Sequence, residues 1–293
     1  EVTCVVPNKY PYFLDWMPGI EEVVVFKTDT EGRAVKAIAE ADVLFCLDFN
    51  AVSRLEILSE TIQGNTTARR VLIDHHLQPD EGFDIVFSHP ESSSTCFLVY
   101  CLVEAMYGTG AITRRMGELL YVGMMTDTGN FAFSHLTPEL FRAVAVLLEK
   151  GISIPEIHNS VYNAYTEGRA RLFGYAINRK MALIEDGTVA YMSLLESEMR
   201  RFQFQQGDSE GFVNYALTIK KVKMSAMFLA HRKFIRISLR SRGNVDVNLF
   251  ARKYFNGGGH KNAAGGKSFL SMEETIDHYI RSVREFAEEG HLG

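Results

Sequence analysis

The chain has 293 residues, of which 46% are hydrophobic and 23% charged, and its formal net charge at pH 7 is −5. This composition is typical of a globular protein with enough apolar residues for one large core or two smaller ones. The net negative charge argues against a protein that binds polyanions through its bulk charge, and no apolar run approaches the ~20 residues that a membrane-spanning helix needs.

Strand-like and helix-like segments alternate in the first part of the chain. Continuous apolar runs rich in Val, Leu and Ile predict strands that are buried on both faces, as in parallel sheets. These runs cover residues 2–7, 22–26, 42–48 and 70–74. Helical stretches at 31–41 and 51–62 lie between them. This β-α-β-α order predicts an α/β fold with a doubly wound, mostly parallel sheet.

Helices are predicted to follow these strands. Their expected ranges are 95–108, 113–127, 138–151 and 154–165. Either Ser92 or Ser94 is placed to cap the first of them. Pro138 and Pro155 occupy first-turn positions, and Gly151 stands where a helix ends.

The character of the chain changes near residue 166. A linking helix is predicted to continue to about Asp186. Beyond it we expect strands and two helices that form a smaller mixed-sheet α/β domain, at 188–194, 223–231, 233–241, 245–255 and 271–289. The predicted organisation is an N-terminal domain over 1–165, a linking helix over 166–185 and a C-terminal domain over 186–293.

Acids and histidines gather where predicted elements end. Asp48 and Asp74 each terminate an apolar strand, His75 and His76 follow directly, and Asp127 ends an apolar helix. A single aspartate at a strand end is more often a turn or helix-capping residue. Ligands of open α/β sheets bind beyond the carboxyl ends of the strands, however, so the coincidence of these groups favours a site there.

Grouped carboxylates and imidazoles indicate a divalent metal, because a cation relieves the repulsion between like charges. Oxygen and nitrogen ligands without thiolate favour manganese, with magnesium, iron, cobalt or zinc as alternatives. Adjacent strand residues point to opposite faces, so we expect only one of the two adjacent histidines to be a ligand. The other would serve a substrate phosphate or a proton.

The segment "FNGGGHKNAAGG" at 255–266 is the second unusual feature. Glycines before His260 leave backbone N–H groups unshielded, which suits an anion cradle; a flexible loop is the alternative. Between Gly211 and Asn262 the chain has eleven Lys or Arg residues and one acid, Asp246. This local basic character favours a phosphorylated substrate, although a solvated hairpin face would explain Lys220 and its neighbours.

Three motifs together resemble a known family. "DHH" at 74–76, "MTDTGNF" at 125–131 and "GGGHKNAAGG" at 257–266 are similar, in order and spacing, to a DHH-family phosphoesterase with a DHH-associated C-terminal domain. The stretch from Leu239 to Gly266 is most similar to the RecJ-like branch that degrades short RNA and hydrolyses 3′-phosphoadenosine 5′-phosphate (pAp). The resemblance implies an enzyme with two Mn²⁺ ions per site, Mg²⁺ or Co²⁺ being alternatives. The four cysteines show no CxxC spacing and lie in apolar stretches, which predicts reduced core thiols in a cytoplasmic protein. A homodimer is a further option.

The resemblance also implies roles for residues of the predicted N-terminal domain. Asp48 corresponds to a carboxylate that bridges both metals, and His75 and Asp127 correspond to ligands of one of them. Asp74 corresponds to an orienting group, and His76 to the histidine that faces the scissile phosphate. We expect Asp74 and His76 to take part in catalysis.

In the predicted C-terminal domain, the resemblance implies that Gly258, Gly259 and His260 hold a substrate phosphate or a terminal nucleotide. Arg240 would pair with phosphate. The expected substrates are short single-stranded oligonucleotides, dinucleotides and pAp, which would be hydrolysed to mononucleotides and AMP.

One departure from the family pattern affects these expectations. The first family motif, a strand that ends in a histidine and two aspartates, has no match, and no histidine precedes Asp48. We expect that motif to lie upstream of Glu1, so that these residues encode about half of a two-metal site. Open alternatives are a cyclic- or linear-dinucleotide phosphodiesterase, a manganese pyrophosphatase, and a nucleotide-binding protein without catalysis.

Overall fold

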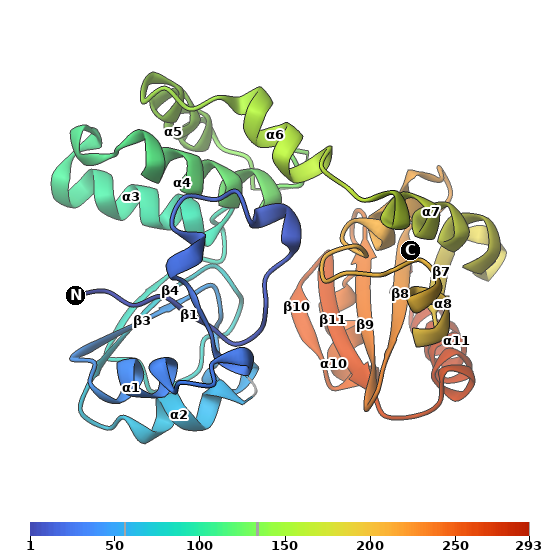
Figure 1. Cartoon of the computed structure of the whole chain (residues 1–293). Coiled ribbons are helices and arrows are strands. Elements are labelled where there is room, and N and C mark those ends of the chain that lie inside the picture. Colours follow the sequence, from blue (N-terminus) through green and yellow to red (C-terminus); the bar gives the residue numbers. More distant parts are fainter. Residues whose placement is uncertain (56, 133–134, 293) are drawn as a thin grey trace. The chain divides into compact units, whose positions relative to one another are not determined.

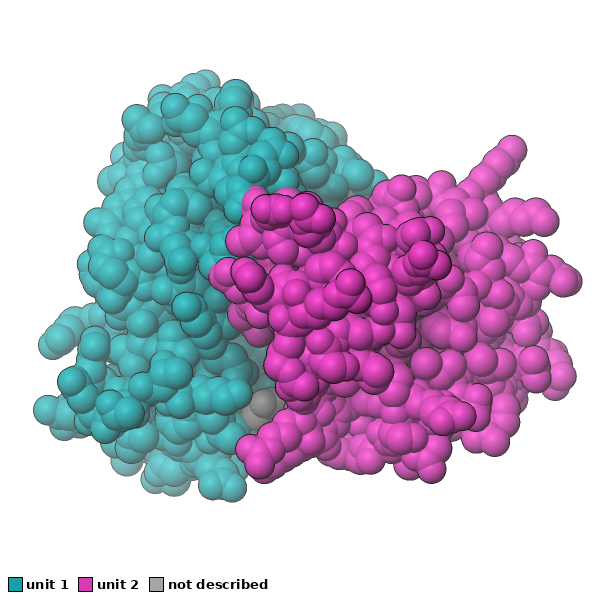
Figure 2. Space-filling model, turned by 45° about the vertical axis from the view of Figure 1, so that its right-hand side comes forward, with its two compact units in different colours: residues 1–164 teal, residues 165–293 magenta. Residues whose placement is uncertain are grey.

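The computed structural model describes residues 1–55, 57–132 and 135–292. The chain divides into two compact units, residues 1–164 and 165–293, which Figure 2 colours separately. In the part of the chain that is described, no helix combines the length and apolar character needed to cross a membrane. The four cysteines are free thiols, but Cys4 is exposed, so the expectation that all of them lie in the core is wrong for this residue.

The first unit is built on parallel strands (Figure 1). Three of them form one sheet in the order β3 (Val43–Leu47), β4 (Arg69–Asp74) and β5 (Ile85–Ser88). The predicted strands at 42–48 and 70–74 are thereby confirmed, whereas β5 was not predicted. Short strands β1 (Val5–Val6) and β2 (Val24–Val25) form a separate parallel pair instead of extending the main sheet.

Burial in this sheet is less complete than the apolar runs predict. Leu72 in the central strand β4 is fully buried, but Val43, Phe45 and Leu47 in β3 are 45–64% exposed. Strand β3 lies at the sheet edge, and its other face packs through Leu44 against the cluster formed by the first two helices. Only one face of β3 is therefore covered, and the expectation of strands buried on both faces is wrong here.

Five of the six helices predicted in the first unit are present with small shifts, and the sixth is shorter. They are α1 (Arg33–Ala39), α2 (Leu58–Gly64), α3 (Thr95–Tyr107), α4 (Arg114–Asp127), α5 (Pro138–Glu149) and α6 (Ile154–Tyr162). Ser94 caps α3 by accepting a hydrogen bond from the Phe97 N–H at 3.0 Å, and Pro138 opens α5. The helix predicted over 51–62 is instead a 3₁₀ turn over Val52–Leu55 followed by α2, and residue 56 lies outside the described residues.

The second unit contains a mixed six-stranded sheet in the order β10-β11-β9-β8-β7-β6, most of which can be followed in Figure 1. Its strands are β6 (Met181–Ile184), β7 (Val189–Leu194), β8 (Met224–His231), β9 (Phe234–Ser241), β10 (Gly258–His260) and β11 (Ala263–Ser268). Strands β7 and β8 are parallel, and the other neighbours are antiparallel. The three strands predicted between 188 and 241 are confirmed.

Helices cover the two faces of this sheet differently. On one face, α10 (Val247–Phe255) and α11 (Met272–Glu288) pack in a core with β8, β9 and β11. On the opposite face, a second core includes residues of β7 and β8 but none of β9, β10 or β11. The helices that contribute to this second core are α7 (Glu167–Tyr175), α8 (Glu196–Arg201) and α9 (Phe212–Tyr215).

One prediction for this unit is corrected. The helix expected as far as residue 186 ends in a π-helical turn at Ala176–Lys180, and the apolar residues that follow form β6 because they pair with the edge of β7. The glycine-rich segment 257–266 contains the tight strand pair β10–β11, which argues against the alternative of a flexible loop. A Cβ atom on Gly257 would lie 1.9 Å from the Gly265 carbonyl oxygen, so only glycine permits this approach of the two strands.

Candidate metal centre

Three predicted ligands from separate segments converge in the first unit. Asp48 follows β3, His75 follows β4, and Asp127 is the last residue of α4. The His75 Nε2 atom lies 3.6 Å from Asp48 Oδ1 and 3.2 Å from Asp127 Oδ2. One ligand atom from each residue falls within 4.8 Å of the others. The side chains of Asp48 and Asp127 are 56% and 41% exposed, so a cation can reach them from solvent.

Backbone geometry brings Asp48 into this group. It adopts a left-handed conformation with φ of 64° directly after the strand, which aspartate tolerates better than most residues. Its N–H donates to the Ile73 carbonyl at 3.2 Å, so the turn stays attached to the neighbouring strand. The Thr95 hydroxyl donates to Asp48 Oδ1 at 2.9 Å and holds the carboxylate. Strained backbone of this kind is common at functional sites.

His75 is oriented by a backbone group. Its Nδ1 lies 3.1 Å from the Ser92 carbonyl oxygen, which can only accept, so Nδ1 carries the proton. The ring is buried, and Nε2 is directed at the two carboxylates. Fixing the second nitrogen in this way is the usual means of presenting an imidazole to a metal.

The electrostatics of this group fit a bound cation. Loss of hydration and the like charge of Asp127 raise the pKa of Asp48. Burial would lower the pKa of His75, but its hydrogen bond to Asp127 and the attraction of that charge outweigh burial and raise the pKa to about 8. Two acids and an imidazole that compete for protons at this distance would be stabilised by a divalent ion, and the oxygen and nitrogen donors suit one.

Asp74 and His76 form a second pair beside the first group. Asp74 is fully buried and accepts hydrogen bonds from His76 Nδ1 at 2.7 Å and from the His76 N–H at 3.1 Å. Burial would raise the pKa of Asp74, but these hydrogen bonds and the charge of His76 lower it. Asp48, Asp74 and His76 also bring ligand atoms within 4.8 Å of one another, so Asp48 belongs to both groups.

The segment "ESSSTC" at 91–96 supports this centre but was read from the sequence only as a helix start. Ser92 orients His75, and Thr95 holds Asp48. A Cβ atom on Gly123 of α4 would lie 2.1 Å from Cys96 Sγ, so the glycine lets α4, which ends in Asp127, approach α3. Consecutive small hydroxyl residues before a helix were the available signal, but their partners are distant in sequence.

The predicted phosphate-binding residues lie on the sheet of the second unit. Arg240 on β9 pairs in register with Ala263 on β11, which pairs with His260 on β10. Arg240, Ala263 and His260 therefore share one face. The Gly259 N–H donates to Asn248 Oδ1 at 2.9 Å. That amide is already used, so the prediction of unshielded glycine N–H groups is wrong at this position.

Comparisons with known proteins agree with this architecture. Residues 1–124 match the DHH family, N-terminal domain, and residues 186–289 match the DHHA1 domain. The chain is 28% identical over 208 residues to the bifunctional oligoribonuclease and PAP phosphatase NrnA of Bacillus subtilis, an alignment that covers 71% of this chain and 64% of that protein. It is 26% identical to the protein of the same name from Thermus thermophilus, over 94% of this chain and 78% of the relative.

A solved structure gives a similar result over more of the chain. The exopolyphosphatase-related protein from Bacteroides fragilis is 41% identical, with a TM-score of 0.89, over 97% of this chain and 83% of that one. The chain spans about 64% of the length of the first curated relatives that it matches. From both domains, their order and this similarity, we conclude that the chain belongs to the DHH family and carries a DHHA1 domain.

Proposed function

We propose that this protein is a divalent-metal-dependent phosphoesterase that hydrolyses short oligonucleotides to mononucleotides and pAp to AMP. The observation that carries the proposal is the convergence of Asp48, His75 and Asp127 within 4.8 Å. The names of the Bacillus and Thermus relatives indicate the substrates.

Asp48, His75 and Asp127 would hold the metal, with Mn²⁺ favoured by the mixed oxygen and nitrogen donors. When bound, a divalent cation stabilises the negative charge that develops on a phosphate during hydrolysis. Asp74 accepts a hydrogen bond from the Nδ1–H group of His76, so the Nε2 atom of that ring can contact a phosphate oxygen or move a proton. In this scheme Asp74 is a positioning residue and His76 is a catalytic one.

The second unit would bind the phosphates of the substrate. Within the described residues Arg240 has no carboxylate at ion-pairing distance, and burial lowers the pKa of its guanidinium group. A cation in these surroundings gains from an anionic ligand. We assign phosphate binding to Arg240 and His260, with Gly258 and Gly259 providing close approach more than N–H donors.

The proposal is tested by a product time course in the presence of Mn²⁺. The substrates are pAp, a labelled dinucleotide, a strand of about 24 nucleotides and a cyclic dinucleotide. We expect pAp and the dinucleotide to react fastest. Preferred hydrolysis of the cyclic compound would instead indicate a cyclic-dinucleotide phosphodiesterase, and binding of pAp without turnover would indicate a nucleotide-binding protein.

An Asp127→Asn variant tests the metal assignment. It removes a ligand charge but keeps the shape, so we expect turnover to fall more than about 100-fold and calorimetric Mn²⁺ binding to weaken in parallel. Asp15→Asn is the matched control, since Asp15 is an exposed acid of the same unit that belongs to neither ligand group. Turnover by Asp127→Asn close to that of the control would refute the assignment.

Linear polyphosphate is a second candidate substrate. The specific observation is the 41% identity to the exopolyphosphatase-related protein from Bacteroides fragilis. Release of inorganic phosphate from polyphosphate, at a higher kcat/KM than from pAp, would favour this function over the first.

A further inference from the structure

One face of the second sheet changes character from strand to strand. Under the helices α7 to α9, β7 and β8 present buried apolar side chains such as Met227 and Leu229. The register continues these rows onto β9, where Ser238 pairs with Met227 and Arg236 pairs with Leu229. None of the β9, β10 or β11 residues belongs to that apolar core. The same face is therefore apolar at one side and polar at the other.

Strand β9 has two distinct faces. Ile235, Ile237 and Leu239 are buried in the core with α10 and α11. The alternate residues Arg236, Ser238 and Arg240 point to the opposite face and are partly exposed. This alternation places two arginines on a sheet face that the apolar core does not cover.

Among the described residues, neither of these two arginines has an acid at ion-pairing distance. The Arg240 Nη1 donates to the carbonyl oxygen of Leu239, and Arg236 Nη2 donates to Ser209 Oγ at 3.2 Å. The Arg236 Nε is buried and has no hydrogen-bond partner within the described chain. Neither guanidinium group forms an ion pair with any described residue, and Glu210 acts on Arg240 only at longer range. Partly buried charges of this kind call for an anion.

An aromatic residue, Phe234, lies beyond Arg236 on this face of β9. We call Arg240, Arg236 and Phe234 together the row. Phe234 is two positions away on the same strand, so it stands on the same face. The His231 ring stacks on it at 5.1 Å, and the Lys267 ammonium lies 5.0 Å from its centroid. Lys267 also pairs in register with Arg236. Cations combined with an aromatic ring are the composition by which proteins bind single-stranded nucleic acids.

The spacing between the two arginines sets the length of an oligonucleotide that can contact both of them. Arg240 and Arg236 are four residues apart, which is ~13 Å along a strand. Between the two arginines this face of the sheet carries only small residues, because Ser238 pairs with Gly265 and Gly265 pairs with Gly258. One nucleotide cannot place its 3′ and 5′ phosphates this far apart, whereas an extended strand with two further steps can.

We propose that the polar face of β9 and β11 is a track for single-stranded oligonucleotides of three or more nucleotides. Arg240 holds the phosphate at the His260 end, Arg236 and Lys267 hold a phosphate further along, and Phe234 stacks on a base. This inference rests on the proposed function and adds to it: the substrate class includes oligonucleotides that span the whole row, and pAp occupies only one end.

The test measures binding of the full chain in EDTA, so that no hydrolysis occurs. The probes are pAp by calorimetry and labelled oligoadenylates of two and five nucleotides by fluorescence anisotropy. For Arg236→Gln we expect the ratio of the pentamer Kd to the pAp Kd to rise about tenfold, because one charged phosphate contact is lost. The slope of log Kd against log salt for the pentamer should fall by about 0.7.

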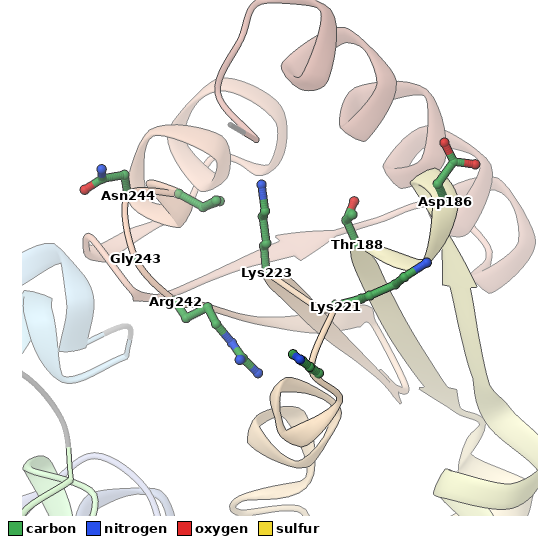
Figure 3. A pocket seen from close by; sticks show the side chains of 9 residues that line it. Asp186, Thr188, Lys221, Lys223, Arg242, Gly243 and Asn244 are labelled. Atoms are coloured by element: carbon green, nitrogen blue, oxygen red, sulfur yellow. The ribbon is translucent and has the colours of Figure 1, made fainter.

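Lys267→Gln provides a second variant that keeps the fold intact, since Lys267 is exposed. It should change the ratio in the same direction. Lys221→Gln is the charge-matched control. Lys221 lines a separate pocket of about 610 Å³ with Lys220, Lys223 and Arg242, shown in Figure 3. This pocket lies beyond the C-terminal end of β9, away from Arg236 and Lys267. We therefore expect Lys221→Gln to leave the ratio of the pentamer Kd to the pAp Kd unchanged.

Two outcomes overturn the track. One is an unchanged ratio in both Arg236→Gln and Lys267→Gln. The other is a larger rise in Lys221→Gln, which would place the distal phosphates in the pocket of Figure 3. Binding is measured without turnover, so the two proposals can fail separately. Absence of hydrolysis in the product assay would refute the proposed function but not the oligonucleotide track. Hydrolysis together with an unchanged Kd ratio would refute only the track.

Discussion

Single residues decide the geometry of the metal centre. Asp48 and His75 each depend on a partner in the segment before α3, namely Thr95 and Ser92. Neither partner is among the converging ligand groups of the described residues. Ligand groups held by hydrogen bonds in this way lose metal affinity when the supporting group is removed.

Thr95→Val keeps the size of the side chain but removes the donor to Asp48. We expect the Mn²⁺ dissociation constant, measured by calorimetry, to rise about tenfold. Thr95→Ser restores the hydroxyl and should recover most of the affinity. If the valine and serine variants bind Mn²⁺ equally well, the hydrogen bond does not position Asp48.

At the scale of elements, close packing of α3 and α4 places Asp127 relative to the strand ends. Gly123→Ala would put a methyl group 2.1 Å from Cys96 Sγ, so we expect the free energy of unfolding to fall by about 1–3 kcal/mol. Gly174→Ala in α7 is the control, because nothing lies within 4 Å of its added methyl group. That variant should be neutral or slightly stabilising. Urea unfolding of both variants checks this, and equal stabilities would contradict the packing argument.

Another element-level contact joins α7 and α8 in the second unit. The Glu198 carboxylate accepts hydrogen bonds from the Leu195 N–H, the Tyr175 hydroxyl and Lys180 Nζ. Burial would raise the pKa of Glu198, but these hydrogen bonds outweigh it and hold the pKa of the carboxyl below its usual value. A lowered folded-state pKa gives stability that is present above the unfolded-state pKa and lost as the pH falls through the folded-state value.

Glu198→Gln therefore has a pH-dependent effect. We expect the variant to be less stable than the wild type by about 1–2 kcal/mol at pH 7, since the charge-assisted hydrogen bonds are weakened. The difference should shrink as the pH is lowered from 5 towards 3. Chemical unfolding at several pH values measures it, and a difference that stays constant would argue against the carboxylate as its source.

At the scale of the whole molecule, each unit has its own hydrophobic clusters, and the candidate metal ligands Asp48, His75 and Asp127 all belong to the first. Ligand binding stabilises the structure that forms the site. We expect Mn²⁺ to slow amide hydrogen exchange at the end of β4 and in α4. Protection confined to β7–β9 instead would place the strongest metal site in the second unit.

The sequence alone determined much of this protein, because its strongest signals are local. Apolar runs marked β3, β4, β7, β8 and β9, and hydroxyl and proline residues marked the starts of α3 and α5. Acids and histidines at the ends of these elements indicated a metal centre. A residue type at the end of an element can be read from the chain, since strand and helix periodicity depends on near neighbours.

Only the tertiary structure decided which groups hold the site in place. The left-handed turn at Asp48, the carbonyl of Ser92 opposite His75 and the contact of Gly123 with Cys96 join segments far apart in sequence. The glycine-rich segment became a strand pair and residues 181–184 became β6 for the same reason. Strand pairing and close packing are properties of two partners, and one stretch of sequence carries information about only one of them.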